Sequence, residues 1–296
     1  MIQSWMFERE QVRELSYTIL KRYFPESVLK KLKQSQRCVV SFSGGVDSTV
    51  IVAAMASILS PKEVHAVMFR SFLHFPEEME RGRLYCLGLG TTLHQIPGPE
   101  IDVLEVMNNS RARCGFCKEA RARELLDFAK KLDADLVLEG SNADDLKDST
   151  RLGTKVLQKM PEIYSPLAKA DLSKNEVRML AKELGITWWN EAATACLATR
   201  FPEGHRLSAV ECSKVARSEW ALRQAGLPQV RVRVFGEMAC VQVPVPLLKE
   251  ALAKREEILG IITQEGYNHV MLDLQGYEWG RKWIKEKEIA GRTDSE

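Results

Sequence analysis

The most informative part of this chain is Cys38-Val-Val-Ser-Phe-Ser-Gly-Gly-Val-Asp-Ser48. Residues 38–42 are apolar apart from one serine, and such a run predicts a short buried strand of a parallel sheet. An apolar helical stretch, residues 49–59, follows the glycine turn directly. A strand, a glycine turn and a helix in this order direct backbone N–H groups and a helix N-terminus at an anion. The stretch therefore predicts a loop that binds phosphate.

The turn itself carries the groups that such a loop needs. Gly44 and Gly45 let phosphate oxygens approach the backbone without a Cβ in the way, and Ser43 and Ser48 add hydroxyl donors at either end. No Gly-Lys-Ser/Thr follows the glycines, so this is not a Walker A loop. It resembles the Ser-Gly-Gly-x-Asp-Ser PP-loop of the ATP pyrophosphatases, which cleave ATP to AMP and pyrophosphate and use the adenylate to activate a carbon–oxygen group. The resemblance implies an ATP site that also includes Asp47.

The bulk properties limit the class of protein. The chain has 296 residues, 45% hydrophobic and 28% charged, which is ordinary for a globular protein and long enough for two domains. Its net charge of +2 gives no basic field that would demand nucleic acid. No run of about 18 apolar residues occurs, and residues 1–10 lack a signal-peptide core, so we expect no membrane span and a cytoplasmic protein. Seven cysteines in a reducing compartment indicate metal binding or catalysis rather than a disulfide scaffold.

Strand and helix patterns alternate as far as residue 190. In residues 7–34, apolar and charged positions alternate at helical spacing, which predicts two short helices with a break at Phe24-Pro25. Ser173 and Glu176 form a capping box at the start of a helix that ends at Gly185. The alternation predicts an α/β fold, a doubly wound parallel sheet over residues 1–190, with ligands beyond the carboxyl ends of its strands. Further strands are expected at 64–69, 92–96 and 135–139, and further helices at 77–87 and 117–131.

The pattern changes after residue 190. Residues 230–235 alternate Val and Arg, which predicts a half-exposed strand, and residues 240–243 complete a hairpin around Gly236. We therefore expect a smaller α+β domain at 191–283, followed by a polar tail at 284–296. Helices are expected in this domain at 207–225 and 246–264, with a last strand at 269–274.

Three cysteines are placed for chemistry. Cys114 and Cys117 form a Cys-x-x-Cys pair just before a strong helical pattern, and such a pair places two thiols close enough to share a metal. Cys196 lies far away in the sequence, and the positive neighbour Arg200 favours a thiolate that serves as ligand or nucleophile. Three thiolates without an obvious fourth ligand fit an iron–sulfur cluster with one iron not held by protein. A zinc site completed by His205, a redox dithiol and no metal at all are the alternatives. The other cysteines lie in strand or helix patterns and are expected to be structural: Cys38, Cys86, Cys212 and Cys240.

Two further polar clusters are candidates for binding. Residues 139–145, Glu-Gly-Ser-Asn-Ala-Asp-Asp, follow an expected strand, and a carboxylate-rich loop there suits Mg²⁺ and nucleotide contacts. Arg231 and Arg233 fall on one face of a strand and can hold a phosphate bidentately. Asp273 ends the last expected strand and can face the same cleft.

Together these residues resemble the LarE-type ATP-dependent sacrificial sulfur transferases, from about Ser41 to Gly280. The first motif is shared with many ATP pyrophosphatases, whereas the later ones, in this order, are far more specific. The motifs are Ser-Gly-Gly-Val-Asp-Ser (43–48), Cys-Gly-Phe-Cys-Lys (114–118), Glu-Gly-Ser-Asn-Ala-Asp-Asp (139–145), Ser-Pro-Leu (165–167), Cys-Leu-Ala-Thr-Arg (196–200), Val-Arg-Val-Arg (230–233) and Leu-Asp-Leu-Gln-Gly-Tyr (272–277).

The resemblance implies an activity. Such enzymes use ATP to adenylate a carboxylate of pyridinium-3,5-dicarboxylic acid mononucleotide and convert it to a thiocarboxylate, a step toward the nickel-pincer nucleotide cofactor of lactate racemase. Relatives with one cysteine, at the position of Cys196, give up the sulfur of that residue and keep dehydroalanine. Relatives with the additional pair resemble iron–sulfur proteins, and this chain has Cys114, Cys117 and Cys196. The resemblance therefore implies a 4Fe–4S cluster on three cysteines, and a homo-oligomer.

The resemblance also implies roles for single residues. Asp47 or Asp145 would hold Mg²⁺ on the phosphates of ATP, and Lys118 would neutralise developing negative charge. The substrate's phosphate would be bound by Arg200, Arg231 and Arg233, with Asp273 nearby.

Three other functions compete with this one. A tRNA thiolase can combine a PP-loop with a three-cysteine cluster, but the chain has neither a basic excess nor a recognisable RNA-binding module. A non-catalytic nucleotide- or metal-sensing module would bind ATP without converting it to AMP. An amidotransferase-coupled synthetase would need a second catalytic domain to supply ammonia.

Overall fold

The computed structural model of the chain describes residues 2–148, 151–191 and 194–277. The chain divides into two compact units, Met1–Ala195 and Cys196–Glu296. The sequence patterns placed this division five residues earlier, after residue 190. The expected polar tail at 284–296 lies outside the described residues.

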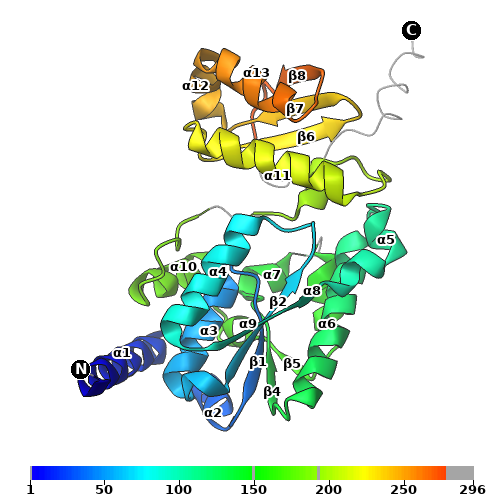
Figure 1. The fold of residues 1–296 in the computed structure, drawn as a ribbon. Helices are drawn as coiled ribbons and strands as arrows, with labels where there is room; N and C mark the ends of the chain where they lie inside the picture. Colours follow the sequence, from blue (N-terminus) through cyan, green and yellow to red (C-terminus); the bar gives the residue numbers. More distant parts are fainter. Residues whose placement is uncertain (1, 149–150, 192–193, 278–296) are drawn as a thin grey trace. The chain divides into compact units, whose positions relative to one another are not determined.

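A five-stranded parallel sheet forms the centre of the first unit (Figure 1). Each strand pairs in parallel with its neighbours, in the order β3-β2-β1-β4-β5. This confirms the predicted doubly wound α/β fold, with β1 at the middle and the chain winding outward in both directions. The strands are β1 (Cys38–Ser41), β2 (Val64–Arg70), β3 (Thr92–Pro97), β4 (Leu136–Leu138) and β5 (Ile163–Tyr164).

Helices cover both faces of this sheet, and their ends follow local sequence signals. Pro25 ends the first helix, which is longer than expected, and Gly90 closes α4 with a left-handed backbone, φ 76°. The capping box of Ser173 and Glu176 starts α10 as predicted. The helices are α1 (Ile2–Tyr23), α2 (Glu26–Lys33), α3 (Val46–Ile58), α4 (Pro76–Leu89), α5 (Leu104–Met107), α6 (Arg113–Lys131), α7 (Ala143–Lys147), α8 (Leu152–Leu157), α9 (Pro166–Lys169) and α10 (Lys174–Glu183). Two short 3₁₀ helices are η1 (Pro61–Glu63) and η2 (Pro99–Asp102).

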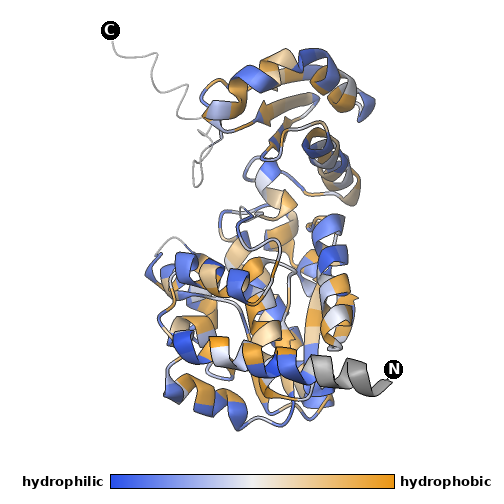
Figure 2. Ribbon diagram, turned by 90° about the vertical axis from the view of Figure 1, so that its left-hand side faces the viewer, coloured by the Kyte–Doolittle hydropathy of each residue, from blue (hydrophilic) through white to orange (hydrophobic). Residues whose placement is uncertain are grey.

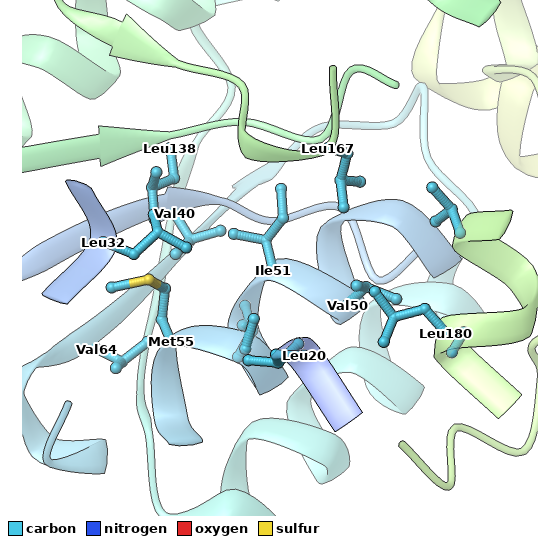
Figure 3. Close-up of a cluster of buried hydrophobic side chains, with 14 of the residues drawn as sticks. Leu20, Leu32, Val40, Val50, Ile51, Met55, Val64, Leu138, Leu167 and Leu180 are labelled. Atoms are coloured by element: carbon cyan, nitrogen blue, oxygen red, sulfur yellow. The ribbon is translucent and has the colours of Figure 1, made fainter. Parts of the chain in front are cut away.

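Two hydrophobic clusters hold the layers of the first unit together. Val40 of β1 faces one cluster, with Ile51 of α3 beside it (Figure 3), whereas Val39 faces the other cluster with Leu125 of α6. Successive residues of a strand point to opposite faces, so an unbroken apolar strand serves both clusters. Figure 2 shows hydrophobic strands, with helices around them that mix hydrophobic and hydrophilic residues.

The second unit is a smaller α+β arrangement around a three-stranded sheet, in the order β6-β7-β8. β6 and β7 form the expected antiparallel hairpin around Gly236, and β8 joins β7 in parallel. One helix was expected at 246–264, but that prediction was wrong, because the segment is interrupted at Lys254. The elements are η3 (Leu197–Arg200), α11 (Ala209–Gln224), β6 (Arg231–Phe235), β7 (Met238–Gln242), η4 (Val245–Leu247), α12 (Leu248–Ala253), α13 (Arg255–Gln264) and β8 (His269–Leu272). Throughout the part of the chain that the structure describes, no helix has the length and apolar character needed to cross a membrane.

Candidate active site

The loop between β1 and α3 is held in shape by its own hydroxyl groups. The Ser43 N–H donates to Ser48 Oγ at 3.2 Å, and the Gly45 N–H donates to Ser43 Oγ at 3.3 Å. Ser48 Oγ in turn donates to the Gly45 carbonyl at 3.1 Å. The helix α3 begins at Val46, so its N-terminus and first N–H groups stand at the end of the loop. The predicted phosphate loop therefore has the strand, turn and helix geometry that binds an anion.

Two glycines bring this loop against α4. Gly44 has φ 78°, and a Cβ on it would lie 2.5 Å from the backbone oxygen of Glu78. A Cβ on Gly82 of α4 would lie 3.2 Å from the Cα of Gly44. The loop and the helix therefore approach each other backbone to backbone, which requires glycine at residue 44.

The loop after β4 contains a buried carboxylate. Glu139 is 2% exposed and accepts hydrogen bonds from the N–H of Ser141 at 3.0 Å and from its hydroxyl at 2.9 Å. Ser165, after β5, also donates to Glu139. Lys118 Nζ lies 3.5 Å from Glu139 Oε2. The structure thus joins Lys118, predicted as a catalytic residue, to the first carboxylate of the 139–145 motif.

This second loop lies directly beside the phosphate loop. A Cβ on Gly140 would stand only 3.2 Å from the backbone nitrogen of Ser48. Further along, Asn142 and Asp145 cap α7 reciprocally, and Arg151 pairs with Asp145 at 2.5 Å. Burial raises the pKa of Asp145, and the guanidinium of Arg151 opposes that shift. Asp145 is therefore a partly buried carboxylate close to the nucleotide loop.

Lys174 is a residue of this site that the sequence patterns missed. Its ammonium group pairs with Asp47 Oδ2, while its backbone N–H donates to Asp144 Oδ2 at 2.8 Å. Asp47 Oδ1 is buried and has no hydrogen-bond partner among the described residues. A buried carboxylate oxygen without a donor suits a hard cation such as Mg²⁺. The available signal was the capping box, which places Lys174 at the first position of α10.

The predicted metal cysteines are the accessible ones. Cys114 and Cys117 stand one turn apart at the start of α6, exposed and half-buried respectively, and Cys196, at the start of the second unit, is half-buried. Accessible thiols fit a metal or a reaction better than buried ones do. No group of three or more His, Cys, Asp or Glu side chains is arranged to hold a metal within the described ranges. The cysteines expected to be structural are all buried: Cys38, Cys86, Cys212 and Cys240.

His205, the alternative zinc ligand, has other partners. Its Nε2 lies 3.0 Å from Glu211 Oε1, and its ring stacks on Phe201 with the centroids 5.0 Å apart. These contacts explain the position of His205 within the second unit without a metal.

The second unit contains a buried ionic cluster centred on Glu219. Arg200 is 2% exposed and donates to both carboxylate oxygens of Glu219, which is 0% exposed, at 2.7 and 3.0 Å. Arg231 Nη1 lies 3.6 Å from Glu219 Oε2. The N–H of Val232 donates to the same carboxylate at 2.9 Å, which fixes it to β6. The structure therefore brings two of the three predicted arginines together on one carboxylate.

Arg233 and Asp273 are linked to each other by Gln242, and Arg233 is linked to Arg200 of the cluster by Thr199. Arg233 Nε donates to Gln242 Oε1 at 2.7 Å, and Gln242 Nε2 donates to Asp273 Oδ2 at 2.6 Å. Burial and the positive charge of Arg200 lower the pKa of Arg233 to about 10, and Arg231 adds to that effect. Repulsion of this kind is relieved when an anion binds, so the cluster is suited to a phosphate.

Sequence patterns missed Glu219 and Gln242. Glu219 occupies a core position of α11, between the buried Val215 and Leu222, and an acidic residue in such a row was the available signal. Gln242 is the direct partner of Arg231 across the hairpin, which only the register of β6 and β7 reveals.

The chain is similar to known proteins over most of its length. The asparagine synthase family matches residues 20–209 of the chain. The chain is 31% identical over 258 residues to the pyridinium-3,5-bisthiocarboxylic acid mononucleotide synthase of Lactiplantibacillus plantarum. The matched region covers 86% of this chain and 92% of that protein. It is 32% identical over 264 residues to an uncharacterized protein of Synechocystis, covering 86% of this chain and 97% of that protein. An uncharacterized protein of Methanocaldococcus jannaschii is 25% identical over 250 residues, covering 84% of this chain and 94% of that protein.

The parallel sheet, the Ser-Gly-Gly-Val-Asp-Ser loop at the end of its central strand and the family match define a PP-loop ATP pyrophosphatase. Within that class the chain belongs to the LarE-type sulfur transferases, as its identity across nearly the whole of a relative shows. It is therefore an enzyme, an ATP-dependent sulfurtransferase that forms AMP and pyrophosphate.

Proposed function

We propose that this enzyme adenylates a carboxylate of pyridinium-3,5-dicarboxylic acid mononucleotide and converts it to a thiocarboxylate in the synthesis of the nickel-pincer nucleotide. The observation that carries the proposal is the buried arginine cluster around Glu219. A mononucleotide presents one phosphate, and Arg200, Arg231 and Arg233 supply the rigid planar donors that bind phosphate bidentately. The Lactiplantibacillus relative is a pyridinium-3,5-bisthiocarboxylic acid mononucleotide synthase, which supports the same substrate class.

The first step uses the nucleotide site of the first unit. A carboxylate oxygen of the substrate attacks the α-phosphorus of ATP, and the bond from that phosphorus to pyrophosphate breaks. The loop at Ser43–Ser48 would hold the phosphates, and Asp47 or Asp145 would hold the Mg²⁺ that offsets their charge. The acyl adenylate is a far better electrophile than the carboxylate, because AMP can leave.

The second step replaces that AMP by sulfur. Sulfur forms a bond to the acyl carbon, the carbon–oxygen bond to AMP breaks, and the product is a thiocarboxylate. Cys114, Cys117 and Cys196, the accessible thiols, would hold a 4Fe–4S cluster, and a sulfide bound to that cluster would be the sulfur donor. Lys118, next to Cys117 and anchored by Glu139, would neutralise negative charge that develops during the transfer.

The test begins with anaerobic purification and quantification of iron, acid-labile sulfide and zinc per chain. About four iron and at least four sulfide per chain, lost in Cys196→Ala, are the expected result. Zinc or no metal would contradict the cluster, and loss of sulfur mass from Cys196 after reaction would show sacrificial chemistry instead. Cys212→Ala is a matched control, since that buried thiol should not affect the metal content.

The substrate is tested separately from the metal. The enzyme is incubated with ATP, Mg²⁺ and the pyridinium mononucleotide, and AMP, pyrophosphate and the thiocarboxylate are quantified by mass spectrometry. Formation of AMP that depends on this substrate is expected. ATP cleavage that does not depend on the pyridinium mononucleotide, or that is stimulated by tRNA, would refute the proposed substrate.

A further inference from the structure

We propose that two buried carboxylates, Glu100 and Glu139, clamp the cysteine-bearing end of α6 and fix the thiols of Cys114 and Cys117 for sulfur delivery. They act as positioning residues through Arg121 and Lys118 on the same helix. The proposal deepens the proposed function and rests on it for the role of the cysteines.

The first half of the clamp is a forked ion pair. Arg121 Nε donates to Glu100 Oε2 at 3.0 Å, and Arg121 Nη2 donates to Glu100 Oε1 at 2.6 Å. Glu100 belongs to η2, which follows β3, and its side chain is 0% exposed. Burial alone would raise the pKa of Glu100, but the guanidinium of Arg121 lowers it to about 2. The pair is therefore charged, desolvated and fixed in direction.

His74 and Phe69 complete the surroundings of Arg121. Arg121 Nη2 lies 2.7 Å from His74 Nε2, and Ser71 Oγ lies 3.3 Å from His74 Nδ1. Burial and the charge of Arg121 lower the pKa of His74 to about 4, so the imidazole is neutral and can accept a hydrogen bond from the guanidinium. The guanidinium also lies 5.7 Å from the ring centroid of Phe69 at the end of β2. The end of β2 thus adds a second contact to the one from η2.

The second half of the clamp comes from the other side of the central strand. Glu139 follows β4, and its carboxylate accepts hydrogen bonds from Ser141 and Ser165. The same carboxylate lies 3.5 Å from Lys118 Nζ. The order β3-β2-β1-β4 places β1 between the two halves. One helix is therefore anchored at two separate points along the edge of the sheet where the nucleotide loop lies.

The helical repeat places the anchors and the thiols on one face. Residues three, four and seven positions apart share a face of an α-helix, and Cys114, Cys117, Lys118 and Arg121 have these spacings. Gly140, next to Glu139, is also in close contact with Ser48 of the nucleotide loop. The clamp therefore relates the thiols to the loop that is proposed to hold ATP.

Desolvation favours a positional role over a purely stabilising one. Buried ion pairs often add little to stability, because the desolvation of both charges offsets their attraction, and apolar replacements of similar volume are frequently tolerated. What a forked pair does supply is direction, since both hydrogen bonds must be satisfied at once. The forked pair of Arg121 fixes direction, and the ion pair of Lys118 with Glu139, one turn earlier, adds a second attachment, so the first turns of α6 have little freedom to shift along the sheet.

The experiment compares Arg121→Met with Arg123→Met by hydrogen–deuterium exchange on the metal-free protein. Arg123 is the matched control, because it pairs with Glu119 on the exposed side of the same helix. We expect exchange in residues 113–120 to be at least about tenfold faster in Arg121→Met, with residues 124–131 and the control unchanged. Glu139→Gln should act in the same direction, and Arg121→Lys, which keeps the charge but not the fork, should restore part of the protection.

Two outcomes would overturn the clamp. One is unchanged exchange in residues 113–120, and the other is a rise spread evenly over α6 and the sheet, which a merely structural pair would give. Should Arg121→Met fail to fold, the isosteric Glu100→Gln takes its place with the same expected pattern.

Steady-state kinetics add a second readout. The clamp predicts that kcat for thiocarboxylate formation falls by about tenfold or more in Arg121→Met while KM for ATP stays within about twofold. A KM for ATP that rises in step would contradict it. If even the unaltered enzyme forms no thiocarboxylate, the proposed function fails, while hydrogen exchange still decides the clamp.

Discussion

The two polar regions of this enzyme are built in opposite ways. The nucleotide loop of the first unit is one contiguous stretch, Ser43–Ser48, held by its own hydroxyls and by the close approach of Gly44 to α4. The buried ionic cluster of the second unit gathers Arg200 of η3 and Arg231 of β6 onto one buried carboxylate, Glu219 of α11. The first region depends on backbone shape and the second on charge balance, so they should fail under different substitutions.

Removing the central carboxylate should have the largest effect. Glu219→Ala leaves Arg200 and Arg231 buried without their shared partner, and breaking a buried ion pair costs about 3–5 kcal/mol of unfolding free energy. Urea denaturation would measure the loss.

Glu265→Ala is the matched control for that substitution. Glu265 accepts from Arg217, which is well exposed, so its loss should stay below about 1 kcal/mol. Similar losses in the two variants would show that charge balance does not govern the second unit.

A methyl group on the nucleotide loop should have the next largest effect. Gly44→Ala combines a positive φ with a Cβ only 2.5 Å from the Glu78 carbonyl, so we expect about 1–3 kcal/mol of strain. ATP affinity, measured by calorimetry, should fall by at least about tenfold, because the loop must move to relieve the clash.

Gly88→Ala tests whether the position matters rather than the residue type. A Cβ at Gly88 of α4 meets no atom within 4 Å, so this change should raise the unfolding free energy by about 0.5–1 kcal/mol. An equal loss of ATP affinity in both variants would refute the shape argument for the loop.

Removing the arginines of β6 should separate substrate binding from ATP binding. In Arg231→Ala/Arg233→Ala the KM for the pyridinium mononucleotide should rise by about 10–100-fold, while the Kd for ATP is unchanged. Failure of ATP binding with intact substrate binding would reverse the assignment of the two regions.

Inorganic phosphate should stabilise the second unit slightly. Burial, together with repulsion from Arg200 and Arg231, lowers the pKa of Arg233 to about 10, and inorganic phosphate should relieve the repulsive part. At ten times its Kd, a ligand that binds only the folded protein adds about 1.4 kcal/mol. Thermal unfolding in phosphate against chloride of equal ionic strength measures this, and Arg233→Ala should abolish the difference. Equal stabilisation by both salts would argue against an anion site.

Sequence patterns predicted the structural features that depend on residues close together in the chain. The phosphate loop, the parallel sheet and the hairpin around Gly236 follow from apolar runs, turn glycines and alternation over a few positions. β5 escaped prediction because it has two residues, Ile163 and Tyr164, and owes its pairing to β4. The break at Lys254 escaped it because helical spacing continues across the interruption.

The residues that were missed share a physical reason. Lys174, Glu219 and Gln242 act on partners 127, 19 and 31 positions away, Asp47, Arg200 and Asp273 respectively. A local pattern shows that a charged or polar residue is present but not which distant group it meets. The motif residues could be named because they are close in sequence, whereas the groups that orient them depend on the folded chain.

The contact between Gly44 and Gly82 has a consequence for protein engineering. Because the loop meets α4 backbone to backbone, the Ser-Gly-Gly-Val-Asp-Ser hexapeptide is not a self-contained module. Transplanted onto another parallel sheet, it would need a helix that carries glycine at the corresponding turn, and a larger residue there would push the loop out of shape. The transferable unit is the pair of segments from Cys38 to Ile58 and from Pro76 to Leu89.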